Sequence, residues 1–222
     1  MAAVVEAREQ PDRLKLTEVF VSLQGEALTS GVPTAFIRLT GCPLRCRYCD
    51  TAYAFTGGEW RGFEAILGEV AGFGVQHVCV TGGEPLAQPR CAKLLTALCD
   101  AGYAVSLETS GAMDISVVDP RVSRIVDIKT PGSGEVGRNR WENLLLLTDR
   151  DAAKLVITGR ADYEWARSVI RKHAALPCPV FFSPSYGDLA PDDLAAWILE
   201  DRLPVRLQIQ LHKLLWGDER GR

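Results

Sequence analysis

The sequence has no hydrophobic run of about 18 residues, the length that a membrane-spanning helix requires. It also has no excess of positive charge, because 28 acidic residues outnumber 25 basic ones and the net charge is −3. A global basic field that would attract nucleic acid or an anionic membrane is therefore missing. No internal repeat and no linker-like change in composition divides the 222 residues. With 47% hydrophobic and 24% charged residues, the chain is expected to fold as one domain with a substantial core.

The N-terminus lacks the long apolar stretch of a secretory signal and carries five charged residues before position 14. We expect residues 1–16 to form a loosely docked arm and residues 17–222 to form the single domain. Seven cysteines without a secretory signal indicate a reducing compartment, so a cytoplasmic location is expected. Four of them are interpreted as small buried packing residues: Cys79, Cys91, Cys99 and Cys178.

Apolar runs with strand character alternate with helical patterns along the domain. Strands are predicted at residues 17–21, 34–39, 77–81, 104–109, 124–129, 153–157 and 179–183. Helices are predicted at residues 63–70, 91–101, 141–147, 162–173 and 192–200, with Asp162 as the N-cap of the fourth. Residues 51–60 are expected to be a loop, and residues 206–211 a strand or a helix. The alternation predicts an α/β fold with a parallel sheet and helical crossovers.

Polar or glycine-rich segments occur at or just after the ends of five of these strands. They are residues 41–51, 82–85, 108–111, 127–129 and 183–185. Because the carboxyl ends of parallel strands meet at one edge of a sheet, these five segments are expected to share one site.

The segment from Gly41 to Thr51 contains three cysteines, Cys42, Cys46 and Cys49, in the spacing Cys-x3-Cys-x2-Cys. Thiolates this close together suit a soft metal centre, which is either zinc or an iron–sulfur cluster. A structural zinc site needs four ligands, yet no second Cys-x2-Cys exists and the three histidines are scattered. A [4Fe-4S] cluster held by three cysteines, with one iron left open, fits the number of ligands better. Zinc and three thiols without a metal stay open as alternatives.

The cysteine segment after one strand, followed by Gly82-Gly-Glu-Pro85 after the next, resembles the radical S-adenosylmethionine superfamily. The resemblance implies a core with the fold of a partial TIM-type barrel, a [4Fe-4S] cluster and S-adenosylmethionine. In that superfamily the open iron chelates the methionine moiety, and reductive cleavage gives a 5′-deoxyadenosyl radical. Gly82 and Gly83 would let the backbone approach the ligand, and Glu84 would place negative charge near its ammonium group.

Within the superfamily, further motifs are similar to those of the 7-carboxy-7-deazaguanine synthases. They are Leu23-Gln-Gly-Glu26, Arg38, Cys49-Asp-Thr51, Glu108-Thr-Ser-Gly111 and the segment from Leu211 to Gly217. This resemblance implies that 6-carboxy-5,6,7,8-tetrahydropterin undergoes ring contraction with loss of ammonia, on a route to queuosine and related 7-deazapurines. It also implies a homodimer, an electron donor of the flavodoxin or ferredoxin type, and Mg²⁺. The chain continues past Trp216 as Gly-Asp-Glu-Arg-Gly-Arg222, which only part of the family resembles.

The family resemblance assigns roles to individual residues. Cys42, Cys46 and Cys49 would hold the cluster, and the hydroxyl of Thr51 would bind Mg²⁺, a cation that prefers oxygen ligands. Substrate contacts would come from Leu23, Gln24, Gly25, Glu26, Arg38, Thr109 and His212. Arg38 would form a bidentate pair with the substrate carboxylate. Cofactor contacts would come from Tyr48, Cys49, Asp50, Gly83, Glu84, Gly111, Lys154, Ser183, Pro184, Ser185 and Tyr186.

Two other functions are compatible with the cysteine segment. A radical S-adenosylmethionine activase, which makes a glycyl radical on a partner protein, shares the cysteine spacing and the small size. The Leu23–Glu26 and Leu211–Gly217 segments favour the pterin enzyme over it. A non-catalytic zinc module is the second alternative, and it differs in predicting bound zinc without iron or sulfide.

Overall fold

A computed structural model describes residues 12–221 of the chain. Its strands are β1 Arg13–Leu23, β2 Pro33–Leu39, β3 Glu59–Gly62, β4 His77–Gly82, β5 Ala104–Thr109, β6 Ser123–Asp127, β7 Ala152–Ile157, β8 Val180–Pro184 and β9 Arg206–Leu207. Its α-helices are α1 Phe63–Gly72, α2 Cys91–Asp100, α3 Arg160–Lys172, α4 Pro191–Asp201 and α5 Leu211–Trp216. Short 3-10 helices are η1 Ala52–Phe55, η2 Pro85–Ala87, η3 Pro131–Ser133, η4 Val136–Arg138 and η5 Trp141–Leu146.

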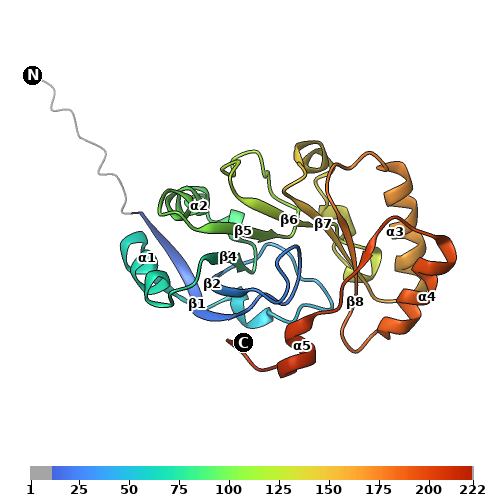
Figure 1. Cartoon of the computed structure of the whole chain (residues 1–222), viewed down its shortest axis with the longest axis horizontal. Helices are drawn as coiled ribbons and strands as arrows, with labels where there is room; N and C mark the ends of the chain where they lie inside the picture. The colour runs from blue at the N-terminus through green and yellow to red at the C-terminus, as the bar shows by residue number, and fades with distance from the viewer. Residues whose placement is uncertain (1–11, 222) are drawn as a thin grey trace, which may run out of the picture.

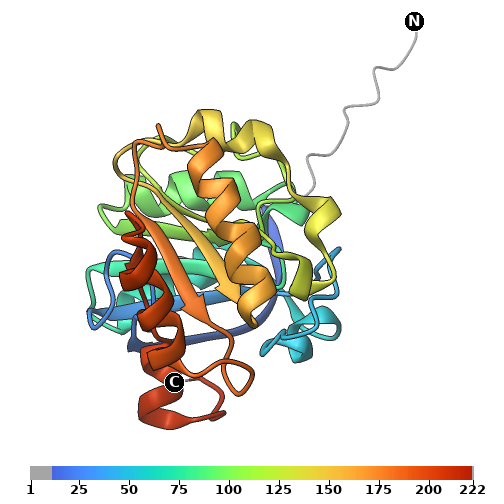
Figure 2. The same ribbon diagram turned by 90° about the vertical axis from the view of Figure 1, so that its right-hand side faces the viewer.

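The strands form one sheet in the order β3-β1-β2-β4-β5-β6-β7-β8-β9. From β2 to β9 every neighbouring pair is parallel, whereas β1 pairs antiparallel with both β2 and β3. The sheet is curved but not closed, and α1 to α4 lie on its outer side (Figures 1 and 2). This arrangement agrees with the predicted α/β fold and the partial barrel.

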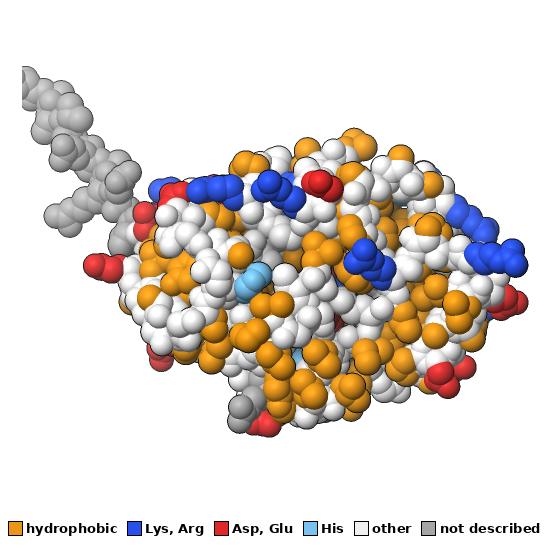
Figure 3. Space-filling model, in the orientation of Figure 1, with side chains coloured by type: hydrophobic (Ala, Val, Ile, Leu, Met, Phe, Trp, Pro, Cys, Tyr) orange, Lys and Arg blue, Asp and Glu red, His pale blue; other side chains and the backbone are white. Residues whose placement is uncertain are grey.

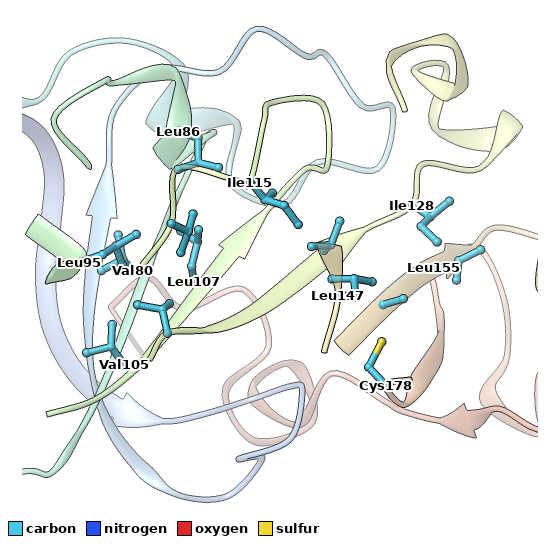
Figure 4. Close-up of a cluster of buried hydrophobic side chains, with 14 of the residues drawn as sticks. Val80, Leu86, Leu95, Val105, Leu107, Ile115, Ile128, Leu147, Leu155 and Cys178 are labelled. Atoms are coloured by element: carbon cyan, nitrogen blue, oxygen red, sulfur yellow. The ribbon is translucent and has the colours of Figure 1, made fainter. Parts of the chain in front are cut away.

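The main hydrophobic core lies between the sheet and its outer helices. Leu94, Leu95 and Leu98 of α2 have no exposed surface, nor do Val80 and Leu107 on the strands they cover. Figure 4 shows Leu95 of α2 directed toward Val80 of β4 and Leu107 of β5. Full burial of each such side chain contributes about 1.5–3 kcal/mol, so this layer fixes the strands whose ends carry the site.

Strand β1 corrects the expected boundary of the N-terminal arm. It begins at Arg13 rather than at residue 17, and Leu14 and Leu16 are buried in the main core. The alternation of charged and apolar residues from Arg13 to Leu16 has the period of a strand with one buried face. Residues 1–11 of the expected arm lie outside the described residues.

Three local expectations also differ from the structure. The predicted loop at 51–60 contains η1 and the first two residues of β3. Residues 206–211 divide between β9 and the start of α5. Helix α3 begins at Arg160, so Asp162 is not its N-cap; instead its buried carboxylate accepts hydrogen bonds from Thr130 Oγ1, at 3.0 Å, and Gly132 N, at 2.7 Å. Asp162 therefore fastens the loop after β6 to α3.

A buried ion pair joins β6 to the turn before β7. The Asp151 carboxylate accepts from Arg124 Nη2 at 2.7 Å and from Thr148 N at 2.7 Å. The side chains of Arg124 and Asp151 are only 10% and 1% exposed, so water has little access to the ion pair. Burial opposes the ionisation of Asp151, but the bonds from Arg124 and Thr148 lower the pKa of its carboxyl below the usual value.

We expect Asp151→Asn to lower the free energy of unfolding by about 3 kcal/mol, because it leaves a buried guanidinium without its counter-charge. Urea unfolding at pH 7 measures this loss. The control Glu164→Gln removes an exposed pair with Arg160, in which both side chains are more than 40% exposed, and should cost less than about 0.5 kcal/mol. The stabilisation by Asp151 should be present above the usual aspartate pKa of about 3.9 and decline as the pH falls below it. Equal costs for the two substitutions would contradict the assignment.

Candidate active site

A cavity of about 470 Å³ opens at the carboxyl ends of the parallel strands. Its walls come from the cysteine segment, from the turn after β1, from the ends of β2 and β4 to β7, and from α5 with the residues around it. Seventeen of the predicted site residues line it, and fifteen of them are Leu23, Gln24, Gly25, Glu26, Arg38, Cys42, Cys46, Tyr48, Cys49, Asp50, Thr51, Gly83, Thr109, Lys154 and His212. Ser185 and Tyr186 line it as well. The expectation that sequence-distant loops meet at one site agrees with this placement.

The cysteine segment is held in place by backbone hydrogen bonds at both ends. Gly41 N donates to Ala54 O at 2.8 Å, and Arg47 N donates to Ser133 O at 2.9 Å. The thiols of Cys42, Cys46 and Cys49 are free and partly buried. Burial raises the pKa of all three above the usual value for cysteine. A positively charged metal centre among them would reverse this tendency and stabilise the thiolates.

The arrangement of these thiols fits a cluster better than a single ion. Between residues 12 and 221, no three side chains of His, Cys, Asp or Glu are gathered so that they could hold one metal ion. A [4Fe-4S] cluster takes each thiolate on a different iron, so its ligands stand farther apart than those of one zinc ion. The three cysteines line the cavity, so a cluster that they hold would be open to a ligand in it.

Gly82, the last residue of β4, and Gly83 after it allow this wall to pack closely. A Cβ on Gly82 would lie 2.5 Å from the carbonyl oxygen of Leu39. A Cβ on Gly83 would lie 2.3 Å from the carbonyl oxygen of Gly41 and 2.8 Å from Cys42 Cβ. Separations below 3.0 Å are not tolerated, so the glycines let the end of β4 press against the cysteine segment.

Glu84 does not line the cavity, in contrast to its expected place beside the cofactor. Its side chain has no exposed surface, and its carboxylate accepts hydrogen bonds from Leu86 N at 2.9 Å, Thr109 Oγ1 at 2.9 Å and Ser110 N at 2.7 Å. The hydroxyl of Ser110 also donates to it. These bonds join the turn after β4 to the end of β5, so the structure gives Glu84 a positioning role.

Three further predicted cofactor residues lie outside the cavity. Gly111 adopts a φ of +74°, and a Cβ there would lie 2.5 Å from the carbonyl oxygen of Asp127, so it serves the turn after β5. Ser183 and Pro184 form the end of β8, and Pro184 borders a separate apolar hollow of about 410 Å³ beside α5. Their contacts with cofactor stay a prediction.

Charged side chains of both signs line the cavity away from the cysteines. Lys154 Nζ pairs with Glu26 Oε2, and Lys129 Nζ donates to Asp127 Oδ2 at 2.8 Å. Although burial disfavours their charge, these carboxylates raise the pKa of both lysines. Burial and the neighbouring Glu26 raise the pKa of Glu108, which accepts from Thr81 Oγ1 at 3.1 Å. The site is therefore nearly balanced in charge before any ligand is present.

Several buried polar atoms on the cavity have no hydrogen-bond partner among the residues that the structure describes, although Asp127 Oδ1 lies 4.0 Å from Lys154 Nζ. They are Glu26 Oε1, Tyr48 Oη and Asp127 Oδ1. An unsatisfied buried polar atom costs about 1–3 kcal/mol, and a ligand that donates hydrogen bonds removes this cost. Glu26 and Asp127 can accept from N–H or O–H groups, and the Tyr48 hydroxyl can donate or accept. These two acceptors and the Tyr48 hydroxyl fit a ligand rich in amino and hydroxyl groups, as S-adenosylmethionine and a pterin both are.

The expected metal and substrate residues near α5 also come together. Thr51 Oγ1 donates to Asp50 Oδ1 at 2.6 Å, which places two oxygen ligands side by side at the cavity wall. The His212 ring lies over Gly25, where a Cβ would be 2.1 Å from His212 Nδ1. Burial lowers the pKa of His212, so the ring is neutral at pH 7.

Several cavity residues were not assigned a role from the sequence. They are Phe20, Thr81, Glu108, Asp127, Lys129, Gln210, Lys213 and Asp218. The segment 127–129 was expected at the site because it lies at a carboxyl strand end, but neither Asp127 nor Lys129 was given a role of its own. Asp218 belongs to the segment after α5, which the sequence left without an assignment, and it is held by Lys213 Nζ at 2.6 Å.

A cysteine-rich segment at the mouth of a partial parallel barrel, packed on a double glycine, defines a radical S-adenosylmethionine protein. Residues 36–127 match the family model of the Radical SAM superfamily. The chain is 46% identical to 7-carboxy-7-deazaguanine synthase of Chlorobaculum tepidum, over 94% of this chain and 97% of that protein. It is 42% identical to the enzyme of the same name from Koribacter versatilis, over 93% and 98% of the two chains. The chain belongs to the 7-carboxy-7-deazaguanine synthase family.

Solved structures agree on the fold. The crystal structure of QueE from Escherichia coli superposes with a TM-score of 0.72 at 24% identity, covering 90% of this chain and 95% of that one. SuiB from Streptococcus suis, bound to S-adenosylmethionine, gives a TM-score of 0.55 at 15% identity, covering 77% and 48%. Membership of the family implies that the chain uses a [4Fe-4S] cluster and S-adenosylmethionine, as the cysteine segment predicts. Family membership also favours a 7-carboxy-7-deazaguanine synthase over the activase and over the zinc module.

We expect Glu84→Gln to destabilise the fold by about 2–4 kcal/mol. The new amide NH₂ would face the backbone N–H groups of Leu86 and Ser110, which can only donate, and hydroxyl groups, which would have to reorient. Urea unfolding of the protein without cluster measures this effect without any ligand. Thr96→Ala on α2, which removes a hydroxyl that donates to Ala92 O outside the site, is the control. A Glu84→Gln protein of wild-type stability that binds S-adenosylmethionine poorly would instead support the direct contact with cofactor.

Proposed function

We propose that the chain converts 6-carboxy-5,6,7,8-tetrahydropterin to 7-carboxy-7-deazaguanine with loss of ammonia, on a route to queuosine or related 7-deazapurines. One observation carries the proposal: a single cavity has the three cysteines on one wall and Arg38 with Glu26 among its other lining residues. Its volume of about 470 Å³ is that of a pocket for small molecules. The names of the relatives support the reaction.

Different residues of the site would bind the cluster and the substrate. Cys42, Cys46 and Cys49 would hold the cluster, which together with S-adenosylmethionine supplies a carbon-centred radical by one-electron reduction. Arg38 would bind the substrate carboxylate, and Glu26 Oε1 would accept a hydrogen bond from the pterin. Orientation by such fixed groups is what the protein contributes to a radical reaction.

Thr51 and its neighbour Asp50 form the proposed Mg²⁺ site. Their oxygen atoms lie 2.6 Å apart at the cavity wall, and Mg²⁺ prefers few protein oxygens together with waters and ligand oxygens. The ion would orient the substrate carboxylate and offset its charge rather than generate hydroxide.

The partners are proposed on the same basis. The chain would act on a small molecule with an electron donor, which we assign to the flavodoxin or ferredoxin type. We assign the active form to a homodimer. Hydrophobic side chains gather over α5 on the face shown in Figure 3. Within this helix, Leu214 is 69% exposed and Leu215 48%. In the described part of the chain, no helix is long and apolar enough to cross a membrane.

An anaerobic assay of the reconstituted protein with carboxytetrahydropterin, S-adenosylmethionine and a reductant, with product followed by mass, tests the proposed reaction. Adding Mg²⁺ should raise kcat/KM on the order of tenfold, and Thr51→Ala should abolish this increase. Thr96→Ala, which lies on α2 away from the cavity, should respond to Mg²⁺ like the wild type. Protein that contains iron and sulfide but forms no 7-carboxy-7-deazaguanine would contradict the proposal.

A further inference from the structure

The guanidinium group of Arg38 is held by the carboxylate of Glu18, a residue that does not line the cavity. Arg38 of β2 and Glu18 of β1 are opposite each other in the antiparallel register. Arg38 Nε donates to Glu18 Oε1 at 2.6 Å, and the two side chains are only 16% and 21% exposed. Tyr53 of η1 donates from its hydroxyl to the same Glu18 oxygen at 2.7 Å. One carboxylate oxygen therefore accepts from both residues.

Aromatic rings confine the same guanidinium group. Arg38 Cζ lies 5.8 Å from the centroid of Phe20 and 5.9 Å from that of Tyr53. Phe20 is itself fixed by stacking on Phe36, at 5.0 Å between centroids and 10° between planes. Rings at these distances attract a cation and restrict how it can turn.

These contacts use only one side of the arginine. Glu18 occupies Nε, and no hydrogen bond joins Nη1 or Nη2 to another residue between 12 and 221. Arg38 also lines the cavity. A guanidinium with Nε held and its terminal nitrogens without partners is ready to bind a planar carboxylate through two parallel hydrogen bonds.

The protonation states agree with this geometry. Burial, and then the hydrogen bond to Glu18, raise the pKa of Tyr53 to about 12, although the charge of Arg38 acts in the opposite direction. The phenol therefore keeps its proton at pH 7 and donates it to Glu18. Arg220, in the segment after α5, lies with Cζ 4.2 Å from the centroid of the same Tyr53 ring. The C-terminal segment thus reaches the group that supports Arg38.

We propose that Glu18 and Tyr53 are positioning residues, which fix Arg38 so that the site selects ligands bearing a carboxylate. The inference rests on the proposed function, because it concerns how that site recognises the acid group of its substrate. Neither residue lines the cavity, so both act through Arg38. An ion pair that only stabilised the β1–β2 pairing would leave ligand selectivity unchanged.

Two stable ligands that differ by one group test this proposal: 6-carboxypterin and pterin. Their binding is measured by equilibrium dialysis on the anaerobically reconstituted protein with S-adenosylmethionine present. The wild type should prefer the carboxylated ligand. Glu18→Gln should lower that preference about tenfold, and Tyr53→Phe about threefold, while the affinity for pterin changes less than about twofold. In turnover, Glu18→Gln should raise KM for carboxytetrahydropterin about tenfold with little change in kcat.

Glu69→Gln is the matched control, since it removes the carboxylate that pairs with Arg61 away from the cavity. It should retain the wild-type preference. A Glu18→Gln protein with an unchanged preference, or one that loses affinity for both ligands equally, would overturn the inference. If Glu18→Gln does not fold, the loss of preference for 6-carboxypterin in Tyr53→Phe tests the same inference. A wild type without any preference for 6-carboxypterin would overturn the proposed substrate instead, which separates the two failures.

Discussion

The site depends on the close packing of the cysteine segment against the turn that follows β4. Two glycines allow the backbones to touch, and the buried carboxylate of Glu84 joins that turn to the end of β5 through several donors. These contacts are made within the chain and need no ligand. They set the position of Cys42 relative to the carboxyl ends of the strands. The cluster wall is therefore placed by folding, and the remaining cavity residues are arranged around it.

The parallel sheet and the meeting of its loops were predictable because they follow from patterns of local sequence. Apolar runs alternating with helical periods specify strands buried on both faces, and glycine or polar residues at their ends specify the loops. The curvature then brings Lys154 of β7 to Glu26 in the turn after β1, although 128 positions separate them. The cysteine spacing indicated a soft metal centre, and the family resemblance supplied the identity of its ligands.

Other features could not be predicted because they depend on tertiary contacts. Glu84 and Gly111 stand in motifs that suggest ligand contact, but the motifs do not show that the Glu84 side chain is fully buried or that Gly111 adopts a positive φ. Arg13 to Leu16 looked like part of a charged arm, but their alternation places two leucines in the core. The roles of Glu18 and Tyr53 arise from the antiparallel register and from η1, neither of which leaves a motif.

The central claim is that one cavity holds the substrate next to the cofactor bound at the cysteine segment. Anaerobic turnover with carboxytetrahydropterin deuterated at C6 tests this most directly, because hydrogen transfer between the two molecules requires contact. If the substrate C6 lies beside the cofactor and the transfer is reversible, S-adenosylmethionine recovered after turnover should carry deuterium. Product formation with no deuterium in the recovered S-adenosylmethionine would contradict the account.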